Sequence, residues 1–256
     1  MKMIDYVQKE IDKELKRLRD NDLPITEYDY DLIVEDNGFM TRRYTTKSKY
    51  QKLLELKKEI LSNDLYKQKN FNKYSFKTFE TDKPYQDYML QKAKAFADKP
   101  KGTFVISGQT ASGKSHLCTA IVKNLILKGY KTKYVVWQEE LDRIKSLPME
   151  DRFREVEYLG NVEVLYLDDF LKTSSNDGQI TESDKKVTNN IINMRYVRGL
   201  TTIISTELNY YQMADIHASM AGRLLEMTNT ENGNYFITVA YKANRNYRER
   251  FLPKEL

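Results

Sequence analysis

The sequence predicts an α/β fold: a parallel sheet covered on both faces by helices, preceded by a small all-helical N-terminal domain. Three observations support this prediction. Apolar, strand-like runs alternate with helical patterns over most of the chain, which is typical of parallel α/β sheets. A glycine-rich stretch, "GQTASGKS" at 108–115, stands between a strand-like and a helix-like segment. The first part of the chain instead carries two helical patterns, so we divide the chain into residues 1–68 and 69–256.

The composition excludes several classes of protein. Of the 256 residues, 31% are charged and 40% hydrophobic, and no apolar run approaches the ~20 residues that a membrane helix needs. The charged N-terminus is neither a signal nor a transit peptide, and a single cysteine, Cys118, excludes an internal disulfide. We therefore expect a cytoplasmic protein with no membrane contact and a buried Cys118 thiol. The net charge of +5 permits nucleic-acid contact but does not demonstrate it, because lysine and glutamate interleave along the chain.

Two amphipathic helices are predicted in residues 1–68. The first covers residues 3–19 and ends before Pro24, and the second lies in "TKSKYQKLLELKKEILSND". A stretch of mixed polarity separates them. Apolar residues recur at steps of three and four on one face of each helix: Ile4, Val7, Ile11, Leu15 and Leu18, then Tyr50, Leu53, Leu54, Ile60 and Leu61. These faces pack either on each other or on a partner, and the pattern favours neither.

From residue 69 onward, the predicted elements alternate. The aromatic residues of "NFNKYSFKTF" cluster without helical period, and Pro84 opens a helix that runs to about Ala97. The next strands are "GTFVIS", "TKYVVW", "VEVLYLDDF" and "LTTIIST", and the helices between them cover about 114–128, 138–158 and 183–197. The segment "TSSNDGQ" is a loop, and "SMAGRLLEMTN" is a further helix. This order predicts a parallel sheet with helices on both faces.

The stretch at 108–115 matches G-x-x-x-x-G-K-[ST], the P-loop pattern. Glycines allow the backbone to wrap around an anion with successive N–H groups pointing inward, and the following helix adds the positive end of its dipole. Lys114 is expected to reach the β- and γ-phosphates of a nucleotide, and Ser115 to take one magnesium position. The predicted nucleotide-binding residues are Gly108, Gln109, Thr110, Ala111, Ser112, Gly113, Lys114 and Ser115.

Two aspartates follow the predicted strand "VLYLDDF". A buried strand that ends in acids places them at the carboxyl edge of the sheet, where α/β folds bind their ligands. Asp168 is the candidate magnesium residue. Asp169 occupies the position from which a carboxylate orients or deprotonates an attacking water.

The strand "LTTIISTEL" ends in three candidates for sensing the γ-phosphate: Ser205, Thr206 and Glu207. We predict Thr206 as a nucleotide contact, although the pattern does not decide among the three. Arg223 is either a surface charge or an arginine finger that reaches a nucleotide on a neighbouring subunit. The closing "YKANRNYRERF" gathers further arginines: Arg245, Arg248 and Arg250.

The chain resembles the AAA+ ATPases of the DnaC/DnaI type, the bacterial replicative helicase loaders, in a phage or mobile-element version. The motifs that carry the resemblance cover about residues 70–250: "YSFKTF", "GQTASGKSHLCTAI", "VLYLDDF", "INMRY", "LTTIIST", "AGRLLEM" and "NYR". It implies an ATP- and Mg²⁺-dependent loader that self-associates through its ATPase domain. Residues 1–68 would bind the hexameric replicative helicase, and the ATPase domain would bind single-stranded DNA. Arg223 matches the arginine-finger position and Arg248 a C-terminal sensor position.

The sequence departs from this pattern in three places. DnaI-type loaders carry zinc-ligand cysteines in the N-terminal domain, and this chain has none, so helicase docking must use another surface. Glu207 stands where many members have an asparagine sensor. Asp169 stands where many AAA+ proteins have glutamate, and its shorter side chain predicts slow hydrolysis.

Two other functions stay open. An IstB-like ATPase would assist a transposase on duplex DNA, and an adaptor would bind ATP with negligible turnover. A metabolic kinase is disfavoured, because nothing resembles a lid or an acceptor pocket. For DNA contact, the candidates around the serine- and asparagine-containing loop are Lys172, Lys185 and Lys186, each of which is also explained as a solvated charge.

Overall fold

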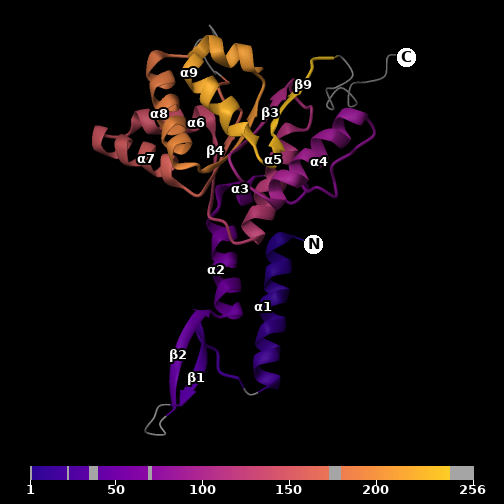
Figure 1. The fold of residues 1–256 in the computed structure, drawn as a ribbon, viewed down its shortest axis with the longest axis vertical. Helices are drawn as coiled ribbons and strands as arrows, with labels where there is room; N and C mark the ends of the chain where they lie inside the picture. Colours follow the sequence, from indigo (N-terminus) through magenta and orange to yellow (C-terminus); the bar gives the residue numbers. More distant parts are fainter. Residues whose placement is uncertain (1, 22, 35–39, 69–70, 173–179, 243–256) are drawn as a thin grey trace. The chain divides into compact units, whose positions relative to one another are not determined.

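The computed structural model describes residues 2–21, 23–34, 40–68, 71–172 and 180–242 (Figure 1). The chain divides into two compact units, Met1–Tyr66 and Lys67–Leu256, whereas the sequence analysis placed the boundary after residue 68. Each unit is described by itself. Among the described residues, none of the helices combines the length and the apolar character needed to span a bilayer.

The N-terminal unit contains the two expected helices, α1 (Met3–Asp20) and α2 (Lys49–Ser62), which pack on each other. A short helix, α3 (Asp64–Lys67), follows at the boundary. Val7, Ile11 and Leu18 are buried, as the apolar period of the first helix predicts. Glu14 is also buried, and its carboxylate pairs with Arg17 and Lys49 at 2.6 and 3.0 Å.

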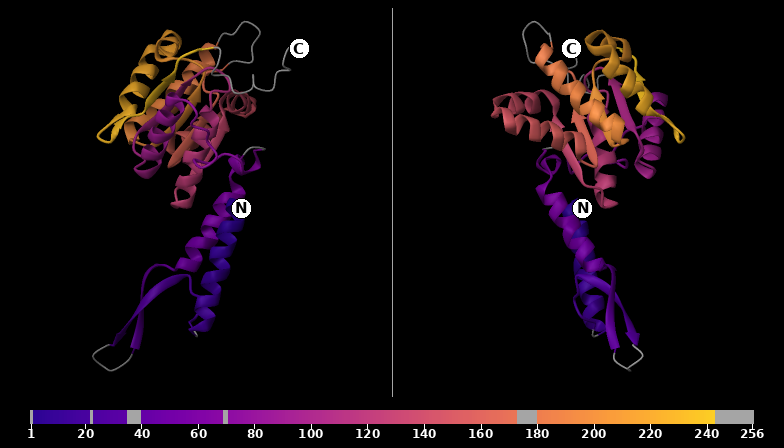
Figure 2. Two further views of the ribbon diagram at one scale, coloured as in Figure 1. Left: turned by 90° about the vertical axis from the view of Figure 1, so that its right-hand side faces the viewer. Right: turned by 60° about the vertical axis from the view of Figure 1, so that its left-hand side comes forward.

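The expectation that this unit is all-helical is corrected by an antiparallel hairpin between α1 and α2. Its strands are β1 (Tyr28–Val34) and β2 (Met40–Lys47), and they form a ribbon beyond one end of α2 (Figure 2). Both strands are rich in aromatic and β-branched residues, which favour extended backbone. Ser48 then begins α2, because its hydroxyl accepts the N–H of Gln51.

The second unit is built on a five-stranded sheet in the order β4-β5-β6-β3-β9, with every pairing parallel. The predicted parallel sheet is therefore confirmed. The strands are β3 (Thr103–Gly108), β4 (Thr132–Val136), β5 (Val164–Asp168), β6 (Thr201–Thr206) and β9 (Phe236–Val239). The sequence analysis did not predict β9, an edge strand beside β3. Because β6 lies between β3 and β5, the ends of all three strands meet at one edge.

Helices cover both faces of the sheet (Figure 1). They are α4 (Pro84–Asp98), α5 (Lys114–Leu127), α6 (Trp137–Ser146), α7 (Met149–Asn161), α8 (Glu182–Arg198) and α9 (Tyr210–Thr228). The helix expected at 138–158 is split into α6 and α7 at Pro148, which supplies no backbone donor. α9 is kinked at His217, and a short pair of strands, β7 (Asn229–Thr230) and β8 (Gly233–Asn234), follows it.

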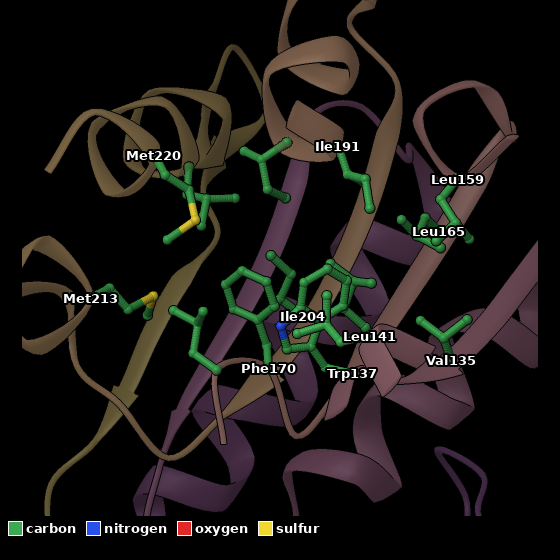
Figure 3. Close-up of a cluster of buried hydrophobic side chains, with 14 of the residues drawn as sticks. Val135, Trp137, Leu141, Leu159, Leu165, Phe170, Ile191, Ile204, Met213 and Met220 are labelled. Carbon is green, nitrogen blue, oxygen red and sulfur yellow. The ribbon is translucent and has the colours of Figure 1, made fainter. Parts of the chain in front are cut away.

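Successive residues of each strand point to opposite faces of the sheet, so the sheet has an apolar layer on each side. On the α6–α9 side, Trp137 and Phe170 lie 5.5 Å apart between ring centroids, within an apolar cluster that takes in side chains from α6 to α9 (Figure 3). On the other side, Phe104 packs with Phe96 of α4, and α5 covers the sheet with the fully buried Cys118. Burial raises the pKa of the Cys118 thiol well above its ordinary value. Strands buried on both faces explain the nearly unbroken apolar runs in the sequence.

Arg195 joins three elements inside this unit. Its guanidinium, on the last turn of α8, is fully buried and donates four hydrogen bonds of 2.5–2.9 Å. The acceptors are the carbonyl oxygens of Leu159, Val162 and Thr201 and the hydroxyl of Thr202. Burial lowers the pKa of Arg195 to about 9, which leaves it charged near neutral pH. This side chain therefore fixes α7 and α8 to the start of β6.

We expect Arg195→Met to lower the free energy of unfolding by roughly 3 kcal/mol, because buried carbonyl groups lose their donors. Urea unfolding followed by circular dichroism measures the loss. Arg198→Met, at an exposed position of the same helix, is the control and should change stability by no more than about 0.5 kcal/mol. Equal effects of the two substitutions would contradict the structural role of Arg195.

Candidate functional site

The glycine-rich loop 108–115 connects the end of β3 to the start of α5. Gly113 begins the helix with φ +95°, and a Cβ there would lie 2.7 Å from the Phe79 ring. A Cβ on Gly108, with φ +148°, would lie 2.7 Å from the carbonyl oxygen of Val239. Both positions therefore require glycine. The tight curve turns the loop backbone around the N-terminus of α5, where an anion is favoured.

Lys114 is almost fully buried in this loop. Its Nζ donates to the carbonyl oxygens of Gly108 and Gln109, at 2.7 and 2.8 Å. Burial lowers the pKa of Lys114, and the carboxylates of Glu207 and Asp169 act in the opposite direction. The ammonium group is thus held inside the curve of the loop.

Asp168 lies at the end of β5, and its carboxylate accepts hydrogen bonds from three hydroxyl groups. Ser115 of α5 donates to Oδ1 at 3.0 Å, Ser205 of β6 donates to the same oxygen, and Tyr134 of β4 donates to Oδ2 at 3.3 Å. Burial and the nearby Asp168 raise the pKa of Tyr134, which therefore stays a donor. The structure thus brings the two predicted magnesium residues, Ser115 and Asp168, together.

Asp169 follows in left-handed backbone geometry, with φ +51°. Its N–H donates to the Ser205 hydroxyl at 3.2 Å, so the turn after β5 is fastened to β6. The Asp169 carboxylate is 41% exposed and lies 3.3 Å from Lys172 Nζ. It is therefore accessible to solvent beside the loop, with a lysine as its partner.

The three candidates at the end of β6 have different surroundings. Thr206 is fully buried, and its hydroxyl donates to the Phe170 carbonyl oxygen at 2.8 Å, so it is not directed at the loop. Thr206 as a nucleotide contact stays a prediction, and in this structure its hydroxyl is engaged by β5's following turn rather than by the loop. Glu207 does reach the loop, where it accepts a 2.6 Å hydrogen bond from the Thr110 hydroxyl. Successive residues of a strand point to opposite faces of the sheet, which explains why Glu207 reaches the loop and Thr206 does not.

Within this chain, Arg223 is not brought to the loop. The Arg223 guanidinium contacts Ser219 and Asn189 and lies over the Tyr196 ring, all of them on α8 and α9. An arginine-finger role for Arg223 is therefore possible only toward another copy of the chain. Arg248, like Arg245 and Arg250, lies outside the described residues.

An aromatic cavity of about 540 Å³ adjoins the loop. It is lined by loop residues 111–116 and by segments of residues 73–86. His116 builds one wall: its ring stacks on Tyr74 at 4.5 Å and meets Phe79 edge-on at 5.2 Å, between ring centroids. Its Nε2 lies 2.9 Å from the Ser75 carbonyl oxygen. The sequence analysis grouped these aromatic residues but missed His116, which directly follows the P-loop motif.

A second cavity, of about 560 Å³, lies on the other flank of the loop. It is more polar and is lined by Gly108, Gln109, Thr110, Glu207 and residues from the start of α9 and the end of β9. The loop therefore separates an aromatic cavity from a polar one. This arrangement suits a ligand with a flat ring at one end and charged groups at the other.

The residues present fit a nucleoside triphosphate with magnesium. Within the described residues, the buried Ser112 hydroxyl in the loop has no hydrogen-bond partner, as expected of a group that awaits a ligand. Ser115 and Asp168 offer the hard oxygen ligands that Mg²⁺ prefers. A buried lysine, a curved glycine loop and this oxygen pair serve to hold a nucleotide, and the protein is of the P-loop NTPase class. More narrowly, the chain belongs to the family described as Novel STAND NTPase 3, whose family model matches residues 86–255.

Two relatives from Bacillus subtilis match about half of the chain. It is 28% identical over 128 residues to "Uncharacterized protein YqaM", an alignment that covers 50% of this chain and 41% of that protein. It is 23% identical over 145 residues to "Phage-like element PBSX protein XkdC", covering 51% and 49% respectively. The chain therefore spans less than half the length of either relative.

Solved structures confirm the fold that the resemblance to DnaC and DnaI implied. The DnaC helicase loader matches with a TM-score of 0.57 at 19% identity, covering 68% of this chain and 100% of that chain. DnaI matches at 0.52 and 18%, covering 74% and 93%. The replication initiator DnaA, bound to AMPPCP and single-stranded DNA, matches at 0.52 and 18%, covering 70% and 52%. At these identities the likeness shows a shared fold.

We expect His116→Ala to weaken ATP binding by about tenfold, because the aromatic wall beside the loop loses its central ring. Inorganic tripolyphosphate, which has no base, should bind the variant as it binds the wild type. Isothermal titration calorimetry with both ligands makes the comparison. Lys77→Ala, at an exposed position of the same segment, is the control. Equal weakening of ATP and tripolyphosphate binding would show that the aromatic cavity does not hold the base.

Proposed function

We propose that the protein is an ATP-dependent loader that binds a hexameric replicative helicase and delivers it to single-stranded DNA. One observation carries the ATPase part of the proposal: Ser115 and Asp168 meet at 3.0 Å beside the buried Lys114. The loader part is supported by the fold that the chain shares with the DnaC helicase loader. The relation to a phage-like element protein is consistent with a mobile-element version.

ATP would bind with its base in the aromatic cavity and its phosphates along the loop. The backbone N–H groups of 108–115 and the N-terminus of α5 would hold the phosphates, and Lys114 would exchange its bonds to Gly108 and Gln109 for phosphate oxygens. Mg²⁺, held by Ser115 and Asp168, would supply charge neutralisation at the β- and γ-phosphates.

Hydrolysis would use Asp169 as the residue that orients the attacking water and accepts its proton. The water oxygen bonds to the γ-phosphorus as the bond to the β–γ bridging oxygen breaks, which leaves ADP and inorganic phosphate. The Asp169 carboxylate is exposed enough to meet a water beside the loop. Because it is shorter than glutamate and pairs with Lys172, we propose that turnover is slow until the protein assembles or binds DNA.

Arg223 would complete the site from a neighbouring copy. Its contacts in this chain are on α8 and α9, and its guanidinium remains partly exposed. Self-association through the ATPase domain would place it against the nucleotide of the next subunit, where such arginines contribute about 10³- to 10⁵-fold to hydrolysis. Assembly and turnover would then be coupled.

We expect Lys114→Ala to abolish detectable ATP binding, since the loop loses its buried cation. Arg223→Ala should bind ATP with wild-type affinity but lose about 10³-fold in hydrolysis by the assembled protein. Calorimetry measures binding, and phosphate release measures turnover. Lys186→Ala, on the surface of α8, is a matched control for loss of a positive charge. Wild-type turnover by Arg223→Ala would rule out the action in trans.

The N-terminal unit would dock the helicase through apolar residues that it leaves in solvent. Val34 and Tyr44 of the hairpin are 67% and 59% exposed. We expect the full-length protein to co-elute with the replicative helicase in gel filtration, and the double variant Val34→Asp/Tyr44→Asp not to do so. Tyr211→Asp, which changes an exposed aromatic residue of the second unit, is the control.

The DNA preference separates this proposal from a transposase-assisting ATPase. The loader should bind single-stranded DNA more tightly than duplex DNA in fluorescence anisotropy, with an affinity that falls steeply as salt increases. A preference for duplex DNA together with no helicase in the co-elution experiment would overturn the loader proposal.

A further inference from the structure

The residues at the end of β6 leave the terminal phosphate without a donor. The Ser205 hydroxyl donates to Asp168, and the Thr206 hydroxyl donates to the Phe170 carbonyl oxygen. Glu207 lies at the loop, but a carboxylate only accepts hydrogen bonds and repels a phosphate. The arrangement therefore requires a donor from another element.

Lys172 lies where such a donor is needed. Its Nζ is 3.3 Å from Asp169 Oδ2 and 3.4 Å from Glu207 Oε1. The same Glu207 oxygen accepts the 2.6 Å hydrogen bond from Thr110 of the loop. The ammonium group of Lys172 is thus linked through one carboxylate oxygen to the loop itself.

The position of Glu207 marks the phosphate end of the loop. Thr110 and Glu207 line the polar cavity on one flank of the loop, and Lys114 and Ser115, to which the phosphates and the magnesium are assigned, line the cavity on the other flank. Of the neighbouring charges, Glu207 has the largest effect in raising the pKa of Lys114, the residue that reaches the β- and γ-phosphates of a P-loop ligand. We place the terminal phosphate on the side of Lys172 because its partner Asp169, 3.3 Å away, directly follows the proposed magnesium residue Asp168.

Glu207 and Lys172 carry opposite charges, and each stabilises the charged form of the other. Burial acts to raise the pKa of Glu207, but the Thr110 hydroxyl and the Lys172 ammonium outweigh it and hold that pKa below its ordinary value. Although burial acts against the charged form of Lys172, Asp169 and Glu207 keep its pKa above the ordinary value. Both groups are therefore ionised near neutral pH, and Lys172 offsets the carboxylate beside the phosphate site.

We propose that Lys172 donates to the terminal phosphate of ATP and so distinguishes ATP from ADP, a role that rests on the proposed ATP site. The long ion pairs of a side chain that is 47% exposed are weak, so a phosphate oxygen readily replaces one of them. When Lys172 turns to the phosphate, the Asp169 carboxylate loses its lysine partner and becomes available to the attacking water. One side chain thereby connects recognition of the triphosphate with release of the catalytic carboxylate.

The test compares ATP and ADP affinities of the full-length Lys172→Met variant by calorimetry with magnesium. ATP should bind at least about tenfold more weakly than to the wild type, as expected for loss of a charged hydrogen bond, and ADP should bind within about twofold. Lys172→Arg should recover part of the ATP affinity. Arg154→Met is the matched control, because Arg154 also pairs with an acidic residue three positions before it, Asp151 at 3.3 Å.

Two results would overturn the proposed role of Lys172 without contradicting the proposed ATP site. One is an unchanged ratio of ATP to ADP affinity in Lys172→Met. The other is equal weakening of both nucleotides with a lower melting temperature, which indicates a structural role. If the wild-type protein itself binds neither nucleotide, the proposed function fails rather than the assignment of Lys172 alone.

Discussion

The site depends on the carboxylate of Asp168, which hydroxyl groups from α5, β4 and β6 hold at the end of β5. Each hydroxyl comes from an element on a different side of the aspartate, so the carboxylate fixes the loop helix to the centre of the sheet. Through Ser205, the same network also fastens the backbone of Asp169. A small shift of β5 or β6 would therefore move the loop, the oxygens proposed to bind magnesium and the carboxylate proposed to orient the water together.

Charge explains why this site has to be completed from outside. Around the loop, the described carboxylates of Asp168, Asp169 and Glu207 face only two ammonium groups, those of Lys114 and Lys172. A triphosphate adds more negative charge to this arrangement. Its binding therefore calls for further positive charge, which a metal ion and an arginine of a neighbouring copy would supply. The electrostatics of the single chain are consistent with the assembly proposed above.

The sequence determined the parts of the site that depend on local pattern. The loop could be predicted from its glycines and lysine, and Asp168 from its place at the end of an apolar strand. Tyr134 could not, because its contact with Asp168 depends on the register of β4 against β5, which no local pattern encodes. Choosing Glu207 over Thr206 required knowing which alternate residues of β6 face inward.

The fold was predictable to a similar degree. Strands buried on both faces produce long apolar runs, and β3, β4, β5 and β6 were recognised in this way. β9 is only four residues long, so its identity as a strand comes from pairing with β3 rather than from its own sequence. The hairpin of the N-terminal unit did carry a signal, the dipeptide Asn37-Gly38 between two β-favouring runs, which the helical pattern of the flanking segments obscured.

The complete burial of Cys118 has a practical consequence for studying the protein in solution. With a single native thiol that is enclosed and hard to ionise, maleimide dyes will react at a cysteine introduced on the surface and leave the native one untouched. Spectroscopic reporters can therefore be attached to the wild-type background one position at a time, without first replacing the native residue beneath the sheet.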